Sequence, residues 1–172
     1  MGIGMCTTPY VLLLNNDTRS FPKMVEELIK TMESADDIFS VSCKMIQFHD
    51  HEKMDDAGDL YTCLGWAFQR GVGQSVGDYR EPAEVFSACA GAAMYRRELF
   101  AKVGLFDELH FAYLEDLDLG YRAKIQGYRN VYCPTAKVYH VGSGTSGSKY
   151  NSFKVKLSAR NSVYVNYKNM PL

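Results

Sequence analysis

Apolar residues first gather in an unbroken run at positions 10–14, which stops abruptly at the polar residues 15–17. Such a run is typical of a strand buried on both faces in a parallel sheet. Apolar side chains then recur at helical spacing over residues 21–32, which predicts an amphipathic helix capped by Ser20. The alternating segment 39–45 predicts a second strand, so the chain opens with a strand, a helix and a strand.

The middle of the chain shows no such periodicity. Glycine and polar residues punctuate positions 49–82, and they predict loops with short strands or hairpins. Small residues dominate positions 88–94, which indicates a backbone that closely approaches another group. A short helix is expected over residues 97–103, and it ends at Gly104.

The last third regains a regular pattern. A helix is expected to open near Tyr113 and to end at Gly127, with acidic residues in its first turn. Short strands are expected at 131–132 and 137–141, and the glycine- and serine-rich segment 142–147 could act as a lid. A C-terminal helix is predicted from aromatic residues at helical spacing among lysines, namely Tyr150, Phe153, Leu157, Tyr164 and Tyr167.

Composition fits one soluble globular domain spanning residues 1–172, because 47% of the residues are hydrophobic and 23% are charged. The 19 basic and 20 acidic residues give a net charge of −1, which leaves no basic field for a nucleic acid. Five cysteines without a CxxC pair favour a reducing, cytoplasmic compartment. Every apolar run is far shorter than the roughly 18 residues of a membrane span.

Two polar positions at strand ends suggest a metal site. Asn15 and Asp17 close the first strand, and in an extended backbone their side chains emerge on the same side. Ligands of open α/β sheets bind beyond the carboxyl ends of the strands, where a carboxylate suits Mg²⁺ or Mn²⁺ on a diphosphate. His140 ends a later strand and could add an imidazole to the same metal. The alternative is that residues 15–18 form only a turn and a helix cap. The polar tract 49–56 is a weaker metal candidate, since such loops are usually solvated.

A pair of acids opens the helix near Tyr113. Glu115 and Asp116 lie about 100° apart around the helix axis, so one can face a site while the other supports the structure. The helix dipole favours an ionised carboxylate there, the state that a general base needs. Asp118 and Arg122 are expected to pair on the helix surface, and Gly120 to leave room for a substrate. The alternative is that these acids only begin the helix.

Taken in order, these motifs resemble the family 2 glycosyltransferases, the GT-A fold enzymes that use nucleotide-sugar donors, and especially their bacterial rhamnosyltransferase-like branch. The resemblance covers most of the chain. Residues 10–18 are similar to the family's strand with its DxD-type motif, and residues 88–97 followed by 103–108 to its acceptor-side segment. Residues 111–119 resemble its ED motif, 138–140 its late metal-binding histidine, and 160–161 an Arg-Asn pair in its following helix.

The resemblance implies an α/β fold, a partial GT-A (Rossmann-like) mixed sheet flanked by helices. It also implies a donor site with a divalent cation, Mg²⁺ or Mn²⁺. The cation would be held by Asp17 and His140, and the donor would contact Asn15, Asn16 and Asp17. The first DxD position is Asn15 here, so the metal assignment depends on Asp17 and His140.

For the acceptor, the resemblance implies that Asp116 is the base that deprotonates the attacking hydroxyl, with inversion at the sugar carbon. Glu115 would position the acceptor or the base, and Ala90 and Gly91 would let a sugar lie close to the backbone. The expected partners are a UDP- or dTDP-linked sugar and a saccharide or lipid-linked acceptor, in cell-envelope polysaccharide synthesis. The basic C-terminal helix could rest on the inner face of the plasma membrane.

The family's nucleotide-binding unit would precede residue 10, where this chain has little sequence. The chain is therefore expected to be the C-terminal part of a catalytic domain, to bind donor weakly or not at all, and to self-associate through an exposed sheet edge. One alternative is a catalytically incomplete fragment that acts only as a glycan- or partner-binding domain. Another is a metal-dependent phosphodiesterase built on Asp17, His140 and the tract 49–56.

Overall fold

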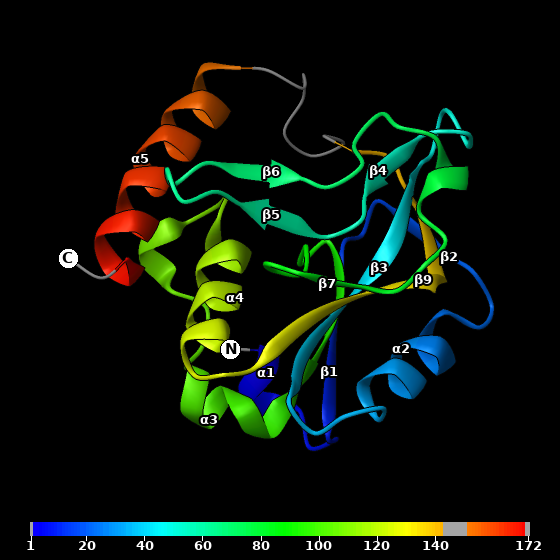
Figure 1. Cartoon of the computed structure of the whole chain (residues 1–172), viewed down its shortest axis with the longest axis horizontal. Helices are drawn as coiled ribbons and strands as arrows, with labels where there is room; N and C mark the ends of the chain where they lie inside the picture. The colour runs from blue at the N-terminus through cyan, green and yellow to red at the C-terminus, as the bar shows by residue number, and fades with distance from the viewer. Residues whose placement is uncertain (1, 143–150, 171–172) are drawn as a thin grey trace.

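The computed structural model describes residues 2–142 and 151–170, so Tyr150 and most of the expected lid, residues 143–147, lie outside the described residues. A seven-stranded mixed sheet forms its centre, in the order β1-β8-β3-β9-β2, with β4 beside β3 and β7 beside β9 (Figure 1). Its strands are β1 (Tyr10–Leu14), β2 (Thr18–Ser20), β3 (Ile38–Gln47), β4 (Met54–Asp56), β7 (Ala83–Val85), β8 (Ala92–Arg96) and β9 (Arg129–His140).

Helices cover both faces of this sheet (Figure 1). The α-helices are α1 (Gly2–Met5), α2 (Met24–Met32), α3 (Phe100–Val103), α4 (Glu115–Ile125) and α5 (Ser152–Asn169). Short 3-10 helices are η1 (Val76–Asp78), η2 (Arg97–Leu99) and η3 (Glu108–His110). Strand β8 alternates between two cores: Met94 packs on the α2 side, and Tyr95 packs on the α3 and α4 side. Each sheet face is thus closed by its own set of helices.

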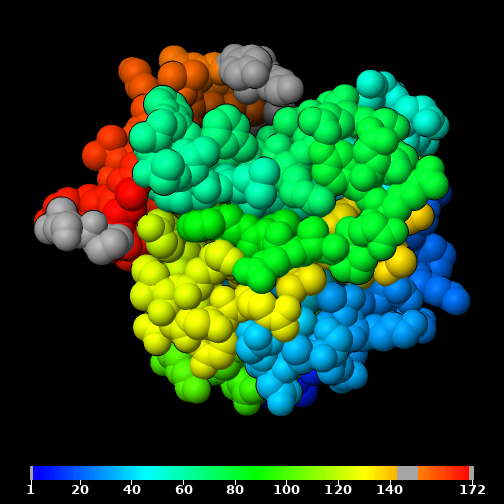
Figure 2. Space-filling model, viewed as in Figure 1, coloured from blue at the N-terminus to red at the C-terminus, as the bar shows by residue number. Residues whose placement is uncertain are grey.

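A two-stranded hairpin, β5 (Asp59–Tyr61) and β6 (Ala67–Gln69), lies beside α5 (Figure 1). It confirms the short strands expected in the middle of the chain. In Figure 2 the segment from this hairpin to β7, coloured teal to green, covers the front of the sheet and leaves little of β9 visible. The irregular middle of the sequence is therefore a cover over one face of the sheet.

The first strand differs from its prediction. Strand β1 pairs only with β8 among the described strands, and it does so in the antiparallel direction. Only Val11 of β1 is buried, and Leu14 is 43% exposed. The predicted parallel, doubly buried strand is wrong because β1 lies at an edge of the sheet. The strand, helix and strand unit exists, but β8 lies between β1 and β3.

The start of the first long helix also differs. Ser20 belongs to β2, where it pairs with Val138, and the Phe21 amide donates to the Lys137 carbonyl. Helix α2 therefore begins only at Met24 and has no side-chain cap. The predicted Ser20 cap is wrong because strand pairing with β9 occupies this segment.

The two short strands expected near the C-terminus form one strand, β9. Its register against β3 shifts after the Cys43 and Cys133 pair, and pairing resumes at Lys44 and Lys137. Pro134 lies in this bulge, where its missing N–H costs no ladder hydrogen bond. The bulge explains why the sequence pattern breaks in two.

Three predicted helices are confirmed. Helix α3 ends at Gly104, with a φ of 86°, and α4 spans Glu115–Ile125 ahead of Gly127. Helix α5 is also confirmed, although the aromatic residues that predicted it do not form its buried side, since Tyr167 is 82% exposed. The buried residues of α5 are Asn161, Val165 and Asn169. No described helix combines the length and hydrophobicity required to cross a membrane.

Candidate active site

The end of β9 brings His140 against the turn that follows β1. Thr18 of β2 pairs with His140, and the Val141 amide donates to the Asp17 carbonyl. His140 Nε2 lies 3.3 Å from Asp17 Oδ1, and Nδ1 lies 2.7 Å from Asp55 Oδ2. The hydrogen bond with Asp55 raises the pKa of His140, with further support from Asp17. The two sequence-predicted metal ligands therefore lie together, and Asp55, an acid of the tract 49–56 that was the weaker metal candidate, joins them.

This donor set fits a hard divalent cation. Adjacent octahedral ligands at about 2.1 Å from Mg²⁺ lie about 3 Å apart, close to the 3.3 Å between His140 Nε2 and Asp17 Oδ1. A metal-binding histidine usually donates a hydrogen bond from its other ring N–H to a carboxylate, which fixes the tautomer and the orientation of the ring. Asp55 occupies that position.

The residues between β1 and β2 form a turn and not the extended backbone that the strand-end argument assumed. The Thr18 hydroxyl donates to the Asn15 carbonyl over 2.7 Å, and the Asn15 amide donates to the Gly91 carbonyl over 2.9 Å. Asn16 is exposed. The hydrogen bond between Asn15 and Gly91 joins the turn that contains Asp17 to the segment before β8.

Glu115 and Asp116 form the first residues of α4. Asp116 accepts hydrogen bonds from the backbone amides of Ala90 at 3.0 Å and Leu117 at 2.8 Å. Burial nevertheless raises the pKa of Asp116. Burial, followed by the neighbouring Asp116, raises the pKa of Glu115 to about 7. Glu115 Oε2 has no hydrogen-bond partner within the described part of the chain.

A pocket of about 350 Å³ lies beside Glu115, which lines it, whereas Asp116 is not among its lining residues. It contains two of the predicted acceptor residues, Ala90 and Glu115, and three residues of the segment 103–108, namely Phe106, Asp107 and Glu108. Leu13 and Phe111 complete the lining. Aromatic rings and carboxylates without a cation in the lining suit the faces and hydroxyls of a neutral sugar.

The glycines near this pocket accommodate protein atoms. A Cβ on Gly91 would lie 3.2 Å from Asn15 Nδ2 and 3.3 Å from Met45 Cε. A Cβ on Gly120 would lie only 2.3 Å from the Ser87 Cβ. The prediction that Gly120 leaves room for a substrate is wrong, because Ser87 already fills that space.

Two further acids lie behind the pair. Asp56 is fully buried, accepts a 2.6 Å hydrogen bond from the Gly58 amide, and has a pKa that burial raises to about 7. Burial likewise raises the pKa of Asp59, whose carboxylate accepts from the Ser87 hydroxyl over 2.7 Å. The charge of Asp116 raises both pKa values. Asp56 belongs to the polar tract 49–56, which was expected to be solvated, and Asp59 was not singled out, because polar loop residues rarely signal burial.

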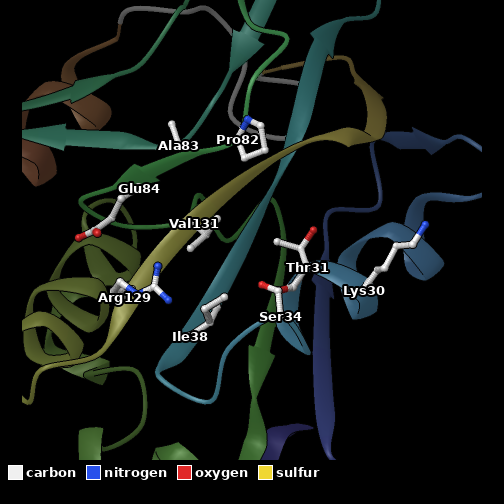
Figure 3. A pocket seen from close by; sticks show the side chains of 9 residues that line it. All are labelled: Lys30, Thr31, Ser34, Ile38, Pro82, Ala83, Glu84, Arg129 and Val131. Carbon is white, nitrogen blue, oxygen red and sulfur yellow. The ribbon is translucent and has the colours of Figure 1, made fainter.

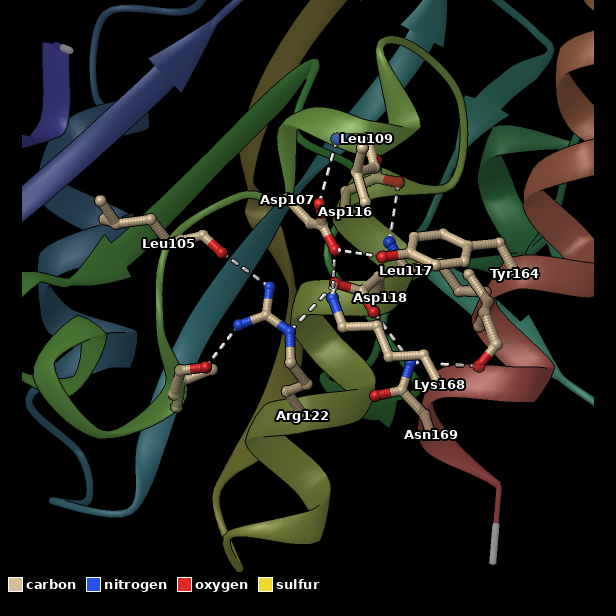
Figure 4. Close-up of polar contacts among 12 residues, drawn as sticks. Leu105, Asp107, Leu109, Asp116, Leu117, Asp118, Arg122, Tyr164, Lys168 and Asn169 are labelled. Atoms are coloured by element: carbon tan, nitrogen blue, oxygen red, sulfur yellow. Dashed lines mark hydrogen bonds and ion pairs between the residues drawn. The ribbon is translucent and has the colours of Figure 1, made fainter.

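The predicted pair of Asp118 and Arg122 forms at 3.0 Å, but not on the helix surface, because Asp118 is fully buried (Figure 4). Lys168 from α5 lies 2.7 Å from Asp107 and 3.0 Å from the same Asp118 oxygen. Asn169 donates to the other Asp118 oxygen over 2.8 Å. These contacts connect the C-terminal helix to α4.

Asp107, His110 and Asp118 offer ligand atoms within 4.8 Å of one another, a spacing that a metal could use. The Lys168 ammonium already lies between the two carboxylates, as Figure 4 shows. Burial lowers the pKa of His110 and keeps its ring neutral. The balance of charge therefore favours an ion-pair anchor over a second metal site.

A larger pocket of about 470 Å³ shares no lining residue with the pocket beside Glu115 (Figure 3). Its charged residues are each paired: Arg129 with Asp37 at 2.6 Å, Glu84 with Lys124 at 2.6 Å, and Lys30 with Glu27. The pocket is lined by Lys30, Thr31, Ser34, Ile38, Pro82, Ala83, Glu84, Arg129 and Val131.

Comparison with known proteins defines the class. The crystal structure of GalNAc-T7 with UDP, GalNAc and Mn²⁺ matches 96% of this chain and 33% of that chain, with a TM-score of 0.66 and 14% identity. This confirms the predicted GT-A fold, a mixed sheet flanked by helices. Residues 10–154 match the model of glycosyl transferase family group 2, and the chain belongs to this family.

Curated relatives match a shorter stretch. Over 54 residues the chain is 44% identical to N-acetylglucosaminyl-diphospho-decaprenol L-rhamnosyltransferase of Mycobacterium tuberculosis, strains CDC 1551 / Oshkosh and ATCC 25618 / H37Rv. This stretch is 31% of the chain and 18% of each relative. The chain thus matches under a fifth of the curated relatives and a third of the solved one.

Proposed function

We propose that the chain supplies the metal-side and acceptor-side halves of a glycosyltransferase site, which transfers a sugar from a UDP- or dTDP-linked donor to a saccharide or lipid-linked acceptor. The observation that carries the proposal is the 2.9 Å hydrogen bond from the Asn15 backbone amide to the Gly91 carbonyl. It joins the turn with Asp17 to the segment whose Ala90 amide holds Asp116. Donor and acceptor groups therefore lie on adjoining backbone.

At the donor, Asp17 and His140 would hold Mg²⁺ or Mn²⁺, with Asp55 orienting the imidazole. When bound, the cation supplies positive charge against the departing diphosphate. The similar proteins, one of them solved with UDP and Mn²⁺ and the other an L-rhamnosyltransferase, support this choice of substrates and metal.

At the acceptor, Asp116 is the proposed base. The acceptor hydroxyl oxygen forms a bond to the sugar carbon, the bond from that carbon to the diphosphate oxygen breaks, and the hydroxyl proton passes to Asp116. In-line attack inverts the configuration at the carbon. The amides of Ala90 and Leu117 hold the carboxylate, and Glu115 accepts a hydrogen bond from the acceptor in the pocket.

A second division of labour follows from one observation: Glu115 lines the pocket and has an oxygen without a partner among the described residues. Glu115 would then take the proton, and Asp116 would fix the Ala90 backbone. Comparing Glu115→Gln with Asp116→Asn separates the two, since only loss of the base removes the fall of kcat at low pH that protonation of the base causes. A lipid-linked acceptor, as in the curated relative's name, would place the site at the inner face of the membrane.

A thermal-shift titration tests the donor half. Mn²⁺ with UDP or dTDP should raise the Tm of the chain, because a ligand that binds only the folded state stabilises it. Asp17→Ala should lose the rise, whereas the exposed Asp36→Ala should keep it. Product formation from nucleotide sugars, followed by mass spectrometry, tests transfer itself. A domain that binds acceptor glycans without any nucleotide response would support the alternative of a glycan-binding fragment.

A further inference from the structure

The loop before α4 is held in an unfavourable backbone conformation. Phe111, Tyr113 and Leu114 have φ angles of 62°, 68° and 65°, and they are the non-glycine residues with positive φ in the described chain. Side chains with a Cβ disfavour this region, and such residues persist only where the surroundings hold them. The strain lies directly before Glu115 and Asp116.

Two neighbouring residues of α5 hold this loop by its carbonyls. The fully buried Asn161 amide lies 3.0 Å from the carbonyl oxygen of His110, 2.8 Å from that of Ala112 and 2.7 Å from that of Tyr113. An amide group has two hydrogens, so these three acceptors share them. One side chain thus satisfies three carbonyls of the strained loop.

Arg160 completes the arrangement. Its Nη2 donates to the carbonyls of Leu109 at 2.6 Å and His110 at 2.9 Å, and its Nε donates to the Asn161 oxygen at 2.9 Å. The last bond fixes which way the Asn161 amide points. Guanidinium and amide therefore act as one unit on residues 109–113.

The loop determines where Glu115 and Asp116 lie, and it also contributes to the pocket wall. Leu114 caps α4 without a side-chain hydrogen bond, and its carbonyl accepts the Asp118 amide at 3.0 Å. Residues of the same loop, Glu108 and Phe111, line the pocket beside Glu115. The backbone that Arg160 and Asn161 hold is therefore the backbone from which the acids start.

We propose that Arg160 and Asn161 are positioning residues of the active site, which hold residues 109–113 so that Glu115 and Asp116 face the acceptor. The inference rests on the proposed function for its catalytic consequence, but not for the structural one. Neither residue needs to touch a substrate.

Hydrogen exchange tests the structural step without any substrate. In Asn161→Ala, amides of residues 110–116 should exchange at least tenfold faster, while amides of β3 keep their protection. Arg160→Ala, a milder change at an exposed residue, should show the same local pattern. The control is Asn166→Ala, which removes another α5 asparagine whose partner is the Tyr61 hydroxyl. Equal exchange at 110–116 in Asn161→Ala, Arg160→Ala and wild type would overturn the inference.

Kinetics at full protein length test the catalytic step. Asn161→Ala should lower kcat roughly 10- to 100-fold, as small misplacements of reacting groups do, with donor KM within about twofold. Asn166→Ala, compared at an equal distance below its own Tm, should keep kcat. An equal loss in both variants would make Asn161 merely structural and overturn the inference. If wild-type protein transfers no sugar while the exchange pattern holds, the proposed function fails and the loop-holding role stands.

Discussion

The Nε2 of His140 lies 3.3 Å from the Asp17 carboxylate, although 123 positions (140 − 17) separate the two residues in the chain. Pairing of β2 with β9 brings them together, and Asp55 holds the opposite ring nitrogen at 2.7 Å. One imidazole thus connects an acid of the proposed donor site to an acid of β4. Its orientation is fixed before any ligand binds.

Removing the orienting carboxylate should weaken metal binding. Asp55→Asn is expected to lower the Mn²⁺ affinity of the chain roughly 10- to 100-fold, the usual effect of losing a carboxylate behind a histidine ligand. Isothermal titration with MnCl₂ measures this directly. The matched control is Glu52→Gln, an exposed acid of the same tract, which should bind like wild type. Unchanged affinity in Asp55→Asn would refute the role given to Asp55.

Glu115 should make the fold pH-dependent. Its pKa is raised from 4.5 in a free side chain to about 7, so folding favours the protonated form. Both states are protonated below about pH 4, and the penalty grows as pH rises through the window from 4.5 to 7. Glu115→Gln should therefore raise the free energy of unfolding at pH 8 by about 1–3 kcal/mol and leave it unchanged at pH 4.

Urea unfolding at the two pH values measures this difference. Glu108→Gln, which changes an exposed acid of the same pocket, is the matched control. A stabilisation of Glu115→Gln that is equal at pH 4 and pH 8 would show that ionisation is not its cause.

The sequence was most informative where structure is local. Helix α4 ends before Gly127 as predicted and begins at Glu115, two residues after the expected Tyr113, because periodicity and the glycine stop signal act within a few residues. Strand order could not be predicted in this way. Strand β8 lies between β1 and β3, so β1 does not pair with β3 as a parallel neighbour. Ser20 pairs with β9 and does not cap α2.

The candidate site divides along the same line. Asp17 and His140 were selected together because strand ends of one sheet converge, and the structure places them in contact. Asp55 belongs to the tract 49–56, which ranked as the weaker metal candidate because polar loops are usually solvated, and its contact with His140, 85 positions away, has no local signal. The contact of Lys168 with Asp107, 61 positions away, likewise has no local signal.

Gly120 should tolerate no side chain. Alanine favours a helix over glycine, yet its Cβ would lie 2.3 Å from the Ser87 Cβ and 2.8 Å from the Ser87 Cα. Gly120→Ala should therefore lower the free energy of unfolding by about 1–3 kcal/mol, the usual cost of overpacking. Thermal unfolding measures the loss. The double variant with Ser87→Gly should recover part of it, and a Gly120→Ala protein as stable as wild type would contradict this packing.

Lys168 should matter for stability because it faces two carboxylates, one of them fully buried. Lys168→Ala leaves Asp118 with Arg122 and Asn169, and leaves Asp107 with the Tyr164 hydroxyl and the Leu109 amide. Removing one partner of a buried ion pair costs about 3–5 kcal/mol, and the partial exposure of Lys168 reduces the expected loss to about 2–3 kcal/mol. Lys156→Ala, an exposed lysine of the same helix, should change the free energy of unfolding by less than about 0.5 kcal/mol. Equal urea midpoints for Lys168→Ala and Lys156→Ala would show that α5 is anchored by its other contacts.

The loss of unfolding free energy in Lys168→Ala should also shrink as pH falls. Lys168 holds the pKa of Asp107 below its ordinary value, and protonation of Asp107 removes the charge that the lysine balances.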